Sequence, residues 1–379
     1  MVDRIPLFEI AWDGADVGNA AESISRGSYW AEGPFIDRFE SGLADYLDVE
    51  HAVTVNSGTT ALVASLRAAN IGPGDEVIVP SFTFIATANA VRLVGAKPVF
   101  GDIERDSYGL DPESVEKELT DRTEAIVPVH LYGEPCRIEE LVEIARSEGL
   151  MIIEDAAEAF GATFEGDYVG TFGEMGVHSF CQNKIVATGE GGAVVTDDDE
   201  LASKLRMYRS HGRVSNDYFD SAESGEYLTL GTNIRMSDLT AAVGCSQLEK
   251  VDRLIEGRRR AATELNERLG AIDGVSVPHP REGTTHVYQL YTVEFDPGID
   301  RRTVIETLES HGVSSKIYWD TPIHETRFYQ DEAVDEYADL PSTTTSADRV
   351  LSLPMHPDLG TTQIDHIVEA TKNGVEKAN

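Results

Sequence analysis

The chain has 379 residues, with 67 acidic against 31 basic side chains and a formal charge of −36. This excess of acid argues against nucleic acid and against an anionic membrane surface as partners, because both would repel it. An apolar content of 41 % is too high for a disordered acidic chain, so a large folded core is expected. Acid spread along the whole length, with only eight lysines among the 31 basic residues, indicates a halophilic protein whose surroundings screen this charge.

Three widely spaced cysteines, Cys136, Cys181 and Cys245, indicate neither a disulfide framework nor a metal site. The N-terminal residues lack the apolar stretch of a signal peptide, and no run of 18 apolar residues occurs. We therefore expect a soluble cytoplasmic protein without a membrane partner or a bound metal.

From residue 53 the chain alternates short apolar runs with helical stretches. Strands are expected at 53–55, 76–79, 97–100, 125–130, 151–154, 176–180 and 193–196, and helices at 61–69, 84–93, 112–119 and 138–148. Near-continuous apolar strands between helices are typical of a parallel sheet covered on both faces. In such sheets ligands bind at the carboxyl ends of the strands.

The pattern changes after residue 196. A helix at 200–208 is followed by a long, charged helical run at 241–269, strands at 286–295 and 314–318, and helices at 302–311 and 364–372. These features predict an α/β fold with two domains: an N-terminal arm and large domain over 1–245, and a smaller α+β domain over 246–379.

Two polar sites follow predicted strands at this ligand-binding edge. Ser57, Gly58 and Thr59 lie between a strand and the start of a helix, where backbone N–H groups and hydroxyls suit a phosphate; the two hydroxyls could instead only cap the helix. Asp155 follows the strand at 151–154 and could pair with a protonated ring nitrogen, or cap the next helix.

Lys184 lies on a short loop between two buried strands, 29 residues after Asp155. An amine in this place suits a nucleophile that forms a Schiff base with an aldehyde cofactor. A surface lysine after a strand is the alternative that this stretch alone leaves open.

The order of phosphate turn, aspartate and lysine resembles that of the fold-type I enzymes, which use pyridoxal 5′-phosphate. More specifically, six local motifs are similar to those of the DegT/DnrJ family of sugar aminotransferases. They lie at 56–62, 80–89, 154–157, 178–184, 188–192 and 231–236.

This resemblance implies a role for each matching residue. Lys184 is expected to hold the cofactor as a Schiff base and to move the proton, and Asp155 to pair with the ring nitrogen. The remaining cofactor contacts that the resemblance implies are Ser57, Gly58, Thr59 and Ser179 at the phosphate, Phe84 stacked on the ring, and Asn233 reaching the phosphate of a partner subunit. A complete site would then need a homodimer.

Glu158 departs from the glutamine or histidine that many members have near the phenolic oxygen of the cofactor. A carboxylate beside a phenolate is repulsive unless it carries a proton or pairs elsewhere. Glu158 is therefore expected either at the cofactor or as a solvated helix residue.

On the substrate side, the resemblance implies Tyr29 and Trp30 at the mouth of the site. We also expect the aromatic and imidazole groups of His286, Tyr318 and His324 there, since they suit a sugar nucleotide; His324 could instead be a surface loop residue. The resemblance to the family implies an enzyme that moves an amino group from glutamate or glutamine to a nucleotide-linked ketosugar, in the synthesis of cell-surface polysaccharide. A cyclitol aminotransferase acting on a keto-inositol, and a non-catalytic regulatory protein with the same fold, are the alternatives.

Overall fold

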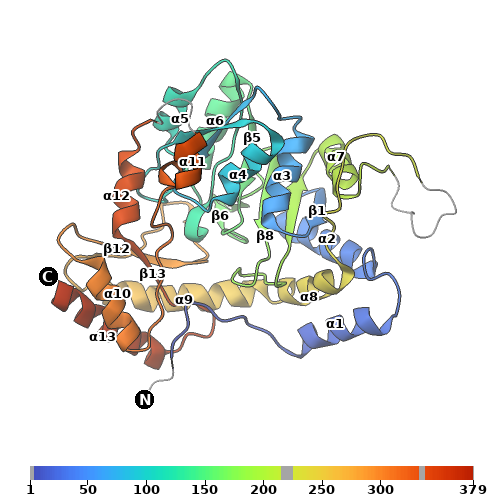
Figure 1. Ribbon diagram of the computed structural model, residues 1–379. Coiled ribbons are helices and arrows are strands. Elements are labelled where there is room, and N and C mark those ends of the chain that lie inside the picture. Colours follow the sequence, from blue (N-terminus) through green and yellow to red (C-terminus); the bar gives the residue numbers. More distant parts are fainter. Residues whose placement is uncertain (1–3, 215–224, 333–337, 379) are drawn as a thin grey trace.

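The computed structural model describes residues 4–214, 225–332 and 338–378 of the chain (Figure 1). Its centre is a seven-stranded sheet made of β1 (His51–Val55), β2 (Glu76–Pro80), β3 (Lys97–Gly101), β4 (Thr123–Ile126), β5 (Met151–Asp155), β8 (Met175–Ser179) and β9 (Gly192–Thr196). The order across the sheet is β1-β9-β8-β5-β4-β2-β3. Neighbouring strands are parallel except at β9, which is antiparallel to both β1 and β8. The predicted α/β fold with a mostly parallel sheet is confirmed.

Alternate side chains of the strands pack against helices on opposite faces of this sheet. In β2, Val77 and Val79 belong to one apolar cluster, whereas Ile78 belongs to another. The first face is covered by α3 (Gly58–Ala68), α4 (Ala86–Val94) and α7 (Asp199–Arg209), and the second by α2 (Pro34–Leu47), α5 (Pro112–Glu118), α6 (Ile138–Glu148) and α8 (Asp238–Leu248). Both faces are therefore buried, which explains why the strands read as continuous apolar runs.

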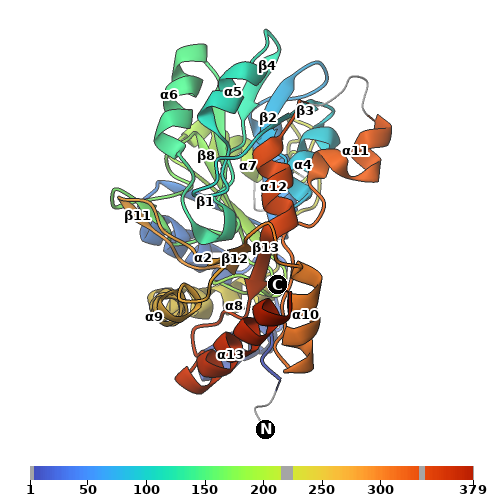
Figure 2. The ribbon, with the colours of Figure 1, turned by 90° about the vertical axis from the view of Figure 1, so that its left-hand side faces the viewer.

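A smaller antiparallel sheet of β10 (Val275–Ser276), β12 (Tyr291–Phe295) and β13 (Val350–Leu353) lies below the main sheet in Figure 2. Its apolar cluster includes residues of α9 (Val251–Leu269), α10 (Arg301–Ser310) and α13 (Thr361–Ala378), and also Ile5. The predicted boundary after residue 245 falls within α8, and the division into two domains stays a prediction. The remaining elements are α1 (Gly14–Ser25), α11 (Arg327–Glu332), α12 (Pro341–Arg349), the short helices η1 (Leu131–Gly133) and η3 (Ile323–Glu325), and a third sheet of β11 (Thr284–Thr285), β6 (Thr163–Phe164) and β7 (Asp167–Tyr168).

Three sequence-based expectations for the C-terminal half were wrong in detail. The strand expected at 286–295 begins only at Tyr291, because Tyr288 has a φ of 50° that a strand excludes. The strand expected at 314–318 is reduced to a single bridge between Lys316 and Ser352. The long helix expected at 241–269 is two helices, because Lys250 leaves the helical conformation and its amine pairs with Asp13 and Asp16.

Within the described part of the chain, no helix has the length and apolar character needed to cross a membrane.

Candidate active site

The start of α3 forms a site for an anion at the end of β1. Ser57 is extended and caps the helix, since its Oγ accepts a hydrogen bond from the Thr60 amide at 3.2 Å. The amides of Gly58 and Thr59 lie in the first turn, where a helix provides no backbone acceptor and its dipole is positive. Ser57 therefore caps the helix, and the helix start still offers two amides to a phosphate.

Two glycines allow other strands to approach this helix start closely. A Cβ on Gly58 would lie 2.9 Å from the Cβ of Ser179, which ends β8. A Cβ on Gly192, at the start of β9, would lie 2.6 Å from the carbonyl carbon of Ser57. The glycine-rich turn after Lys184 therefore supports the anion site directly, a role that its sequence alone did not reveal.

Asp155 ends β5 and is only 5 % exposed. Its carboxylate accepts hydrogen bonds from Thr87 Oγ1 at 2.9 Å and from the Ala157 amide at 3.2 Å. Burial raises the pKa of this carboxyl, against the opposing effects of these two hydrogen bonds and of the Lys184 charge. A buried carboxylate of this kind is suited to hold a proton that it shares with a ring nitrogen.

Lys184 lies between β8 and β9, and its Nζ is 3.0 Å from Oε1 of Glu158. The other oxygen of Glu158 accepts a hydrogen bond from the Tyr132 amide at 3.1 Å. Both side chains are nearly buried, with 13 % of Lys184 and 10 % of Glu158 exposed. Glu158 is therefore held against the amine. It is not the solvated helix residue that was one expectation, and Lys184 is not a surface lysine.

These groups line one cavity of about 540 Å³, which we call the Lys184 cavity. Of the residues singled out in the sequence, the cavity brings together Ser57, Gly58, Thr59, Phe84, Asp155, Glu158, Ser179, Lys184 and Tyr318. The arrangement fits pyridoxal 5′-phosphate, because it places an anion-binding helix start, a buried carboxylate and an amine around a space of the size of a small ligand.

Five residues expected at the site lie outside this cavity. Asn233 is exposed on a loop that bridges to Ser210, and Tyr29 and Trp30 are 48 % and 56 % exposed. His286 stacks on Tyr288, with 3.9 Å between ring centroids, and lines a different cavity.

His324 is buried, with Nδ1 2.6 Å from the Ser81 hydroxyl. The two histidines, His286 and His324, are held by packing and hydrogen bonds within the chain. Neither histidine lines the cavity that holds Lys184, so no contact with the substrate is proposed for them.

Several lining residues were given no role from the sequence. Trp319 packs against Phe84 with 5.3 Å between ring centroids, and Lys316 places its Nζ 4.6 Å from the centroid of Tyr318. Phe8 reaches the cavity from the N-terminal arm. Their place depends on long-range packing, and no local pattern marks them.

Comparisons with known proteins identify the family of the chain. The chain matches the DegT/DnrJ/EryC1/StrS aminotransferase family over residues 13–372. It is 40 % identical over 370 residues to GDP-perosamine synthase of Caulobacter vibrioides, covering 97 % of each chain. It is also 39 % identical over 350 residues to dTDP-3-amino-3,4,6-trideoxy-alpha-D-glucose transaminase of Streptomyces venezuelae, covering 92 % of this chain and 89 % of the relative. A crystal structure of S. venezuelae DesV superposes with a TM-score of 0.92 at 36 % identity, over 100 % of both chains. The chain belongs to the DegT/DnrJ/EryC1/StrS family and is a pyridoxal phosphate-dependent aminotransferase.

Proposed function

We propose that this aminotransferase moves an amino group from glutamate or glutamine to a nucleotide-linked ketosugar. The relatives named GDP-perosamine synthase and dTDP-3-amino-3,4,6-trideoxy-alpha-D-glucose transaminase support a nucleotide-linked sugar. The observation that carries the proposal is the position of the Lys184 amine, held 3.0 Å from Glu158 in the cavity that Asp155 also lines.

Each residue around the cavity has a distinct task in this proposal. Pyridoxal phosphate, when bound, supplies an aldehyde carbon and a ring that accepts electrons. Lys184 provides the amine for that carbon, and its Nζ then carries the proton from one carbon of the reacting system to the other. Asp155, when ionised, would keep a proton on the ring nitrogen, and the hydrogen bonds that it accepts from Thr87 and the Ala157 amide favour the ionised form against the effect of burial.

The remaining cofactor contacts position these reacting groups. Ser57, Gly58, Thr59 and Ser179 would hold the phosphate at the start of α3. Phe84 and Trp319 form an aromatic wall beside Lys184, and Phe84 would stack on the ring. Glu158 restrains Nζ through the ion pair and is itself restrained by the Tyr132 amide.

Tyr318 is proposed to contact the sugar. Its ring lines the cavity, and burial together with the charge of Glu158 raises the pKa of its hydroxyl to about 12. The hydroxyl therefore stays protonated at neutral pH and can donate a hydrogen bond to a sugar oxygen.

We also propose a homodimer in which Asn233, Tyr29 and Trp30 contribute to the cavity of the partner. Large apolar side chains on and near α1 and at 227–230 are exposed in the single chain, among them Trp12 at 70 % and Leu230 at 80 %. A surface of this kind on a folded chain favours association.

If sites are shared, mixing inactive Lys184→Ala and Asn233→Ala subunits should restore activity, because one site of each mixed dimer then carries neither change. Failure of the mixture to regain activity, with mixed dimers present, would argue against shared sites.

The substrate class can be tested with the purified holoenzyme. We expect glutamate or glutamine to convert the cofactor to its amine form, seen as a loss of visible absorbance. A nucleotide-linked 3- or 4-ketosugar should then restore that absorbance. Restoration by keto-inositol and by no nucleotide sugar would instead assign a cyclitol substrate, and no response to any donor would indicate a non-catalytic protein.

A further inference from the structure

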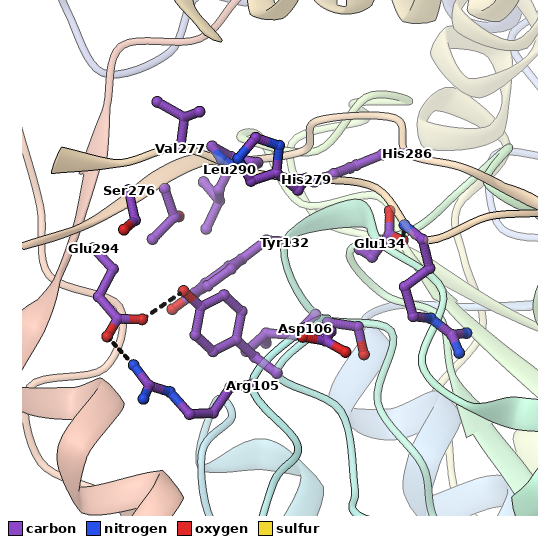
Figure 3. Close-up of a pocket in the computed structure, with 16 residues that line it drawn as sticks. Arg105, Asp106, Tyr132, Glu134, Ser276, Val277, His279, His286, Leu290 and Glu294 are labelled. Atoms are coloured by element: carbon purple, nitrogen blue, oxygen red, sulfur yellow. Dashed lines mark hydrogen bonds and ion pairs between the residues drawn. The ribbon is translucent and has the colours of Figure 1, made fainter. Parts of the chain in front are cut away.

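A second cavity of about 370 Å³ lies between the main sheet and the segment 276–294 (Figure 3). Ser276, His279 and Leu290 face Arg105 and Tyr132 across it. We call it the Glu134 cavity. It shares no lining residue with the Lys184 cavity among the residues that the structure describes.

The side chain of Glu134 is incompletely satisfied in this cavity. The residue is only 4 % exposed, and its Oε1 accepts hydrogen bonds from the Arg281 amide at 3.0 Å and from Thr284 Oγ1 at 2.7 Å. Its Oε2 is buried and has no hydrogen-bond partner in the described part of the chain. Buried carboxylate oxygens normally accept a hydrogen bond, so we expect this oxygen to accept one from a molecule outside the chain.

The nearby cations are already engaged elsewhere. Arg105 pairs with Glu294, which also accepts a hydrogen bond from the Tyr108 hydroxyl (Figure 3). The guanidinium of Arg281 donates to the carbonyls of Pro135 and Cys136 and lies 3.6 Å from Glu139. Asp106 also lines the cavity and lies 3.5 Å from Arg137, which is outside the lining; the lining thus has three carboxylates against two guanidinium groups, which favours a cation over a phosphate.

The other walls are aromatic rings and hydroxyls. Tyr108 and Tyr132 lie with 5.5 Å between ring centroids, and His286 presents a third ring. Ser107 and Ser276 line the same space. Aromatic faces that alternate with carboxylates and hydroxyls suit a ring that has C–H faces and polar edges.

We propose that the Glu134 cavity binds a polyhydroxylated ring that carries an ammonium group, such as an amino sugar without phosphate. The ammonium or a hydroxyl group would donate to Oε2 of Glu134, and the C–H face of the ring would lie on Tyr108 or Tyr132. Because Tyr132 also donates its amide to Glu158, this ligand would occupy the space behind the wall of the Lys184 cavity.

The test uses the holoenzyme after borohydride reduction, which blocks Lys184, and titration calorimetry. The probe is methyl glucosaminide, which cannot open to an aldehyde, and methyl glucoside is its neutral counterpart. We expect saturable binding of the amine-bearing probe at millimolar concentration and at least about tenfold weaker binding of the neutral one, since a hydrogen bond to a charged group is lost.

Variants locate the binding. Glu134→Gln keeps an oxygen for Arg281 and Thr284 but turns the free acceptor into a donor, so affinity should fall at least about tenfold. Glu143→Gln removes an exposed acid of α6 outside the cavity and should change affinity less than about twofold. Ser276→Tyr should fill the cavity from its rim and abolish binding. No saturable binding to the wild type, or equal binding to the Glu134→Gln variant, would mean that the cavity holds only water and would overturn the proposal.

Discussion

The carboxylate of Glu158 lies 3.0 Å from the amine of Lys184, and the two side chains are nearly buried together. Removing either partner leaves the other charge poorly solvated, whereas removing both does not. In a cycle of Glu158→Gln, Lys184→Met and the double variant, we expect each single change to destabilise the cofactor-free protein. The coupling energy should be about 1–3 kcal/mol, measured by urea unfolding. Additive effects within about 0.3 kcal/mol would show that the contact contributes nothing to stability.

The hydrogen bond from Thr87 to Asp155 should set the acid limit of activity. Thr87 Oγ1 donates to the ionised carboxylate and so lowers its pKa, against the larger effect of burial that raises it. Replacing Thr87 with valine removes only the lowering effect, so the pKa of Asp155 should rise further. The acid limb of the plot of kcat against pH should move to higher pH by about one unit. A shift of one pKa unit corresponds to about 1.4 kcal/mol, which is the size of one such hydrogen bond. Thr371→Val, a buried threonine whose hydroxyl donates to the Ile367 carbonyl within α13, is the matched control and should leave the limb in place.

Gly192 should be needed for cofactor affinity although it contacts no reacting atom. Its Cβ would lie 2.6 Å from the Ser57 carbonyl group, so Gly192→Ala must displace the start of α3. We expect pyridoxal phosphate to bind at least about tenfold more weakly, since the helix amides would be moved from the phosphate. Gly298→Ala, where a Cβ meets nothing within 4 Å, should bind the cofactor as the wild type does. Equal affinities in a cofactor titration would refute this role.

The charge of −36 predicts that stability depends strongly on salt. At low ionic strength the acidic groups repel one another over more than 10 Å, and concentrated salt screens this repulsion to about 3 Å. We expect Tm to rise as KCl is increased from about 0.1 M to several molar. A Tm that stays constant or falls over this range would contradict adaptation to high salt.

The parallel sheet and the three groups Ser57, Asp155 and Lys184 could be predicted because each follows a buried strand. Such strands have a strong local pattern, and their carboxyl ends meet at one edge. The contact of Glu158 with Lys184 could not be predicted, since it depends on how two turns 26 residues apart are oriented. The same limit applies to Lys316, which lies in a segment expected to be a strand, and to Trp319, which follows that segment.

Side-chain chemistry alone was misleading on the substrate side. An imidazole suits a sugar ligand, but it equally suits a buried hydrogen bond such as that of His324 with Ser81. His286 lines a different cavity and stacks on Tyr288, whose positive φ could not be predicted because tyrosine rarely adopts it. The roles proposed for Tyr29, Trp30 and Asn233 would depend on a partner subunit, which one sequence does not describe.

The most direct test of the central claim is to identify the residue that binds the cofactor covalently. The purified protein should be incubated with pyridoxal phosphate, reduced with borohydride, digested and analysed by mass spectrometry. We predict a yellow protein that is bleached on reduction, with the added mass on the peptide that contains Lys184. The Lys184→Ala variant should gain neither colour nor mass. Added mass on another lysine, or a Lys184→Ala variant that aminates its substrate at the wild-type rate, would contradict the account.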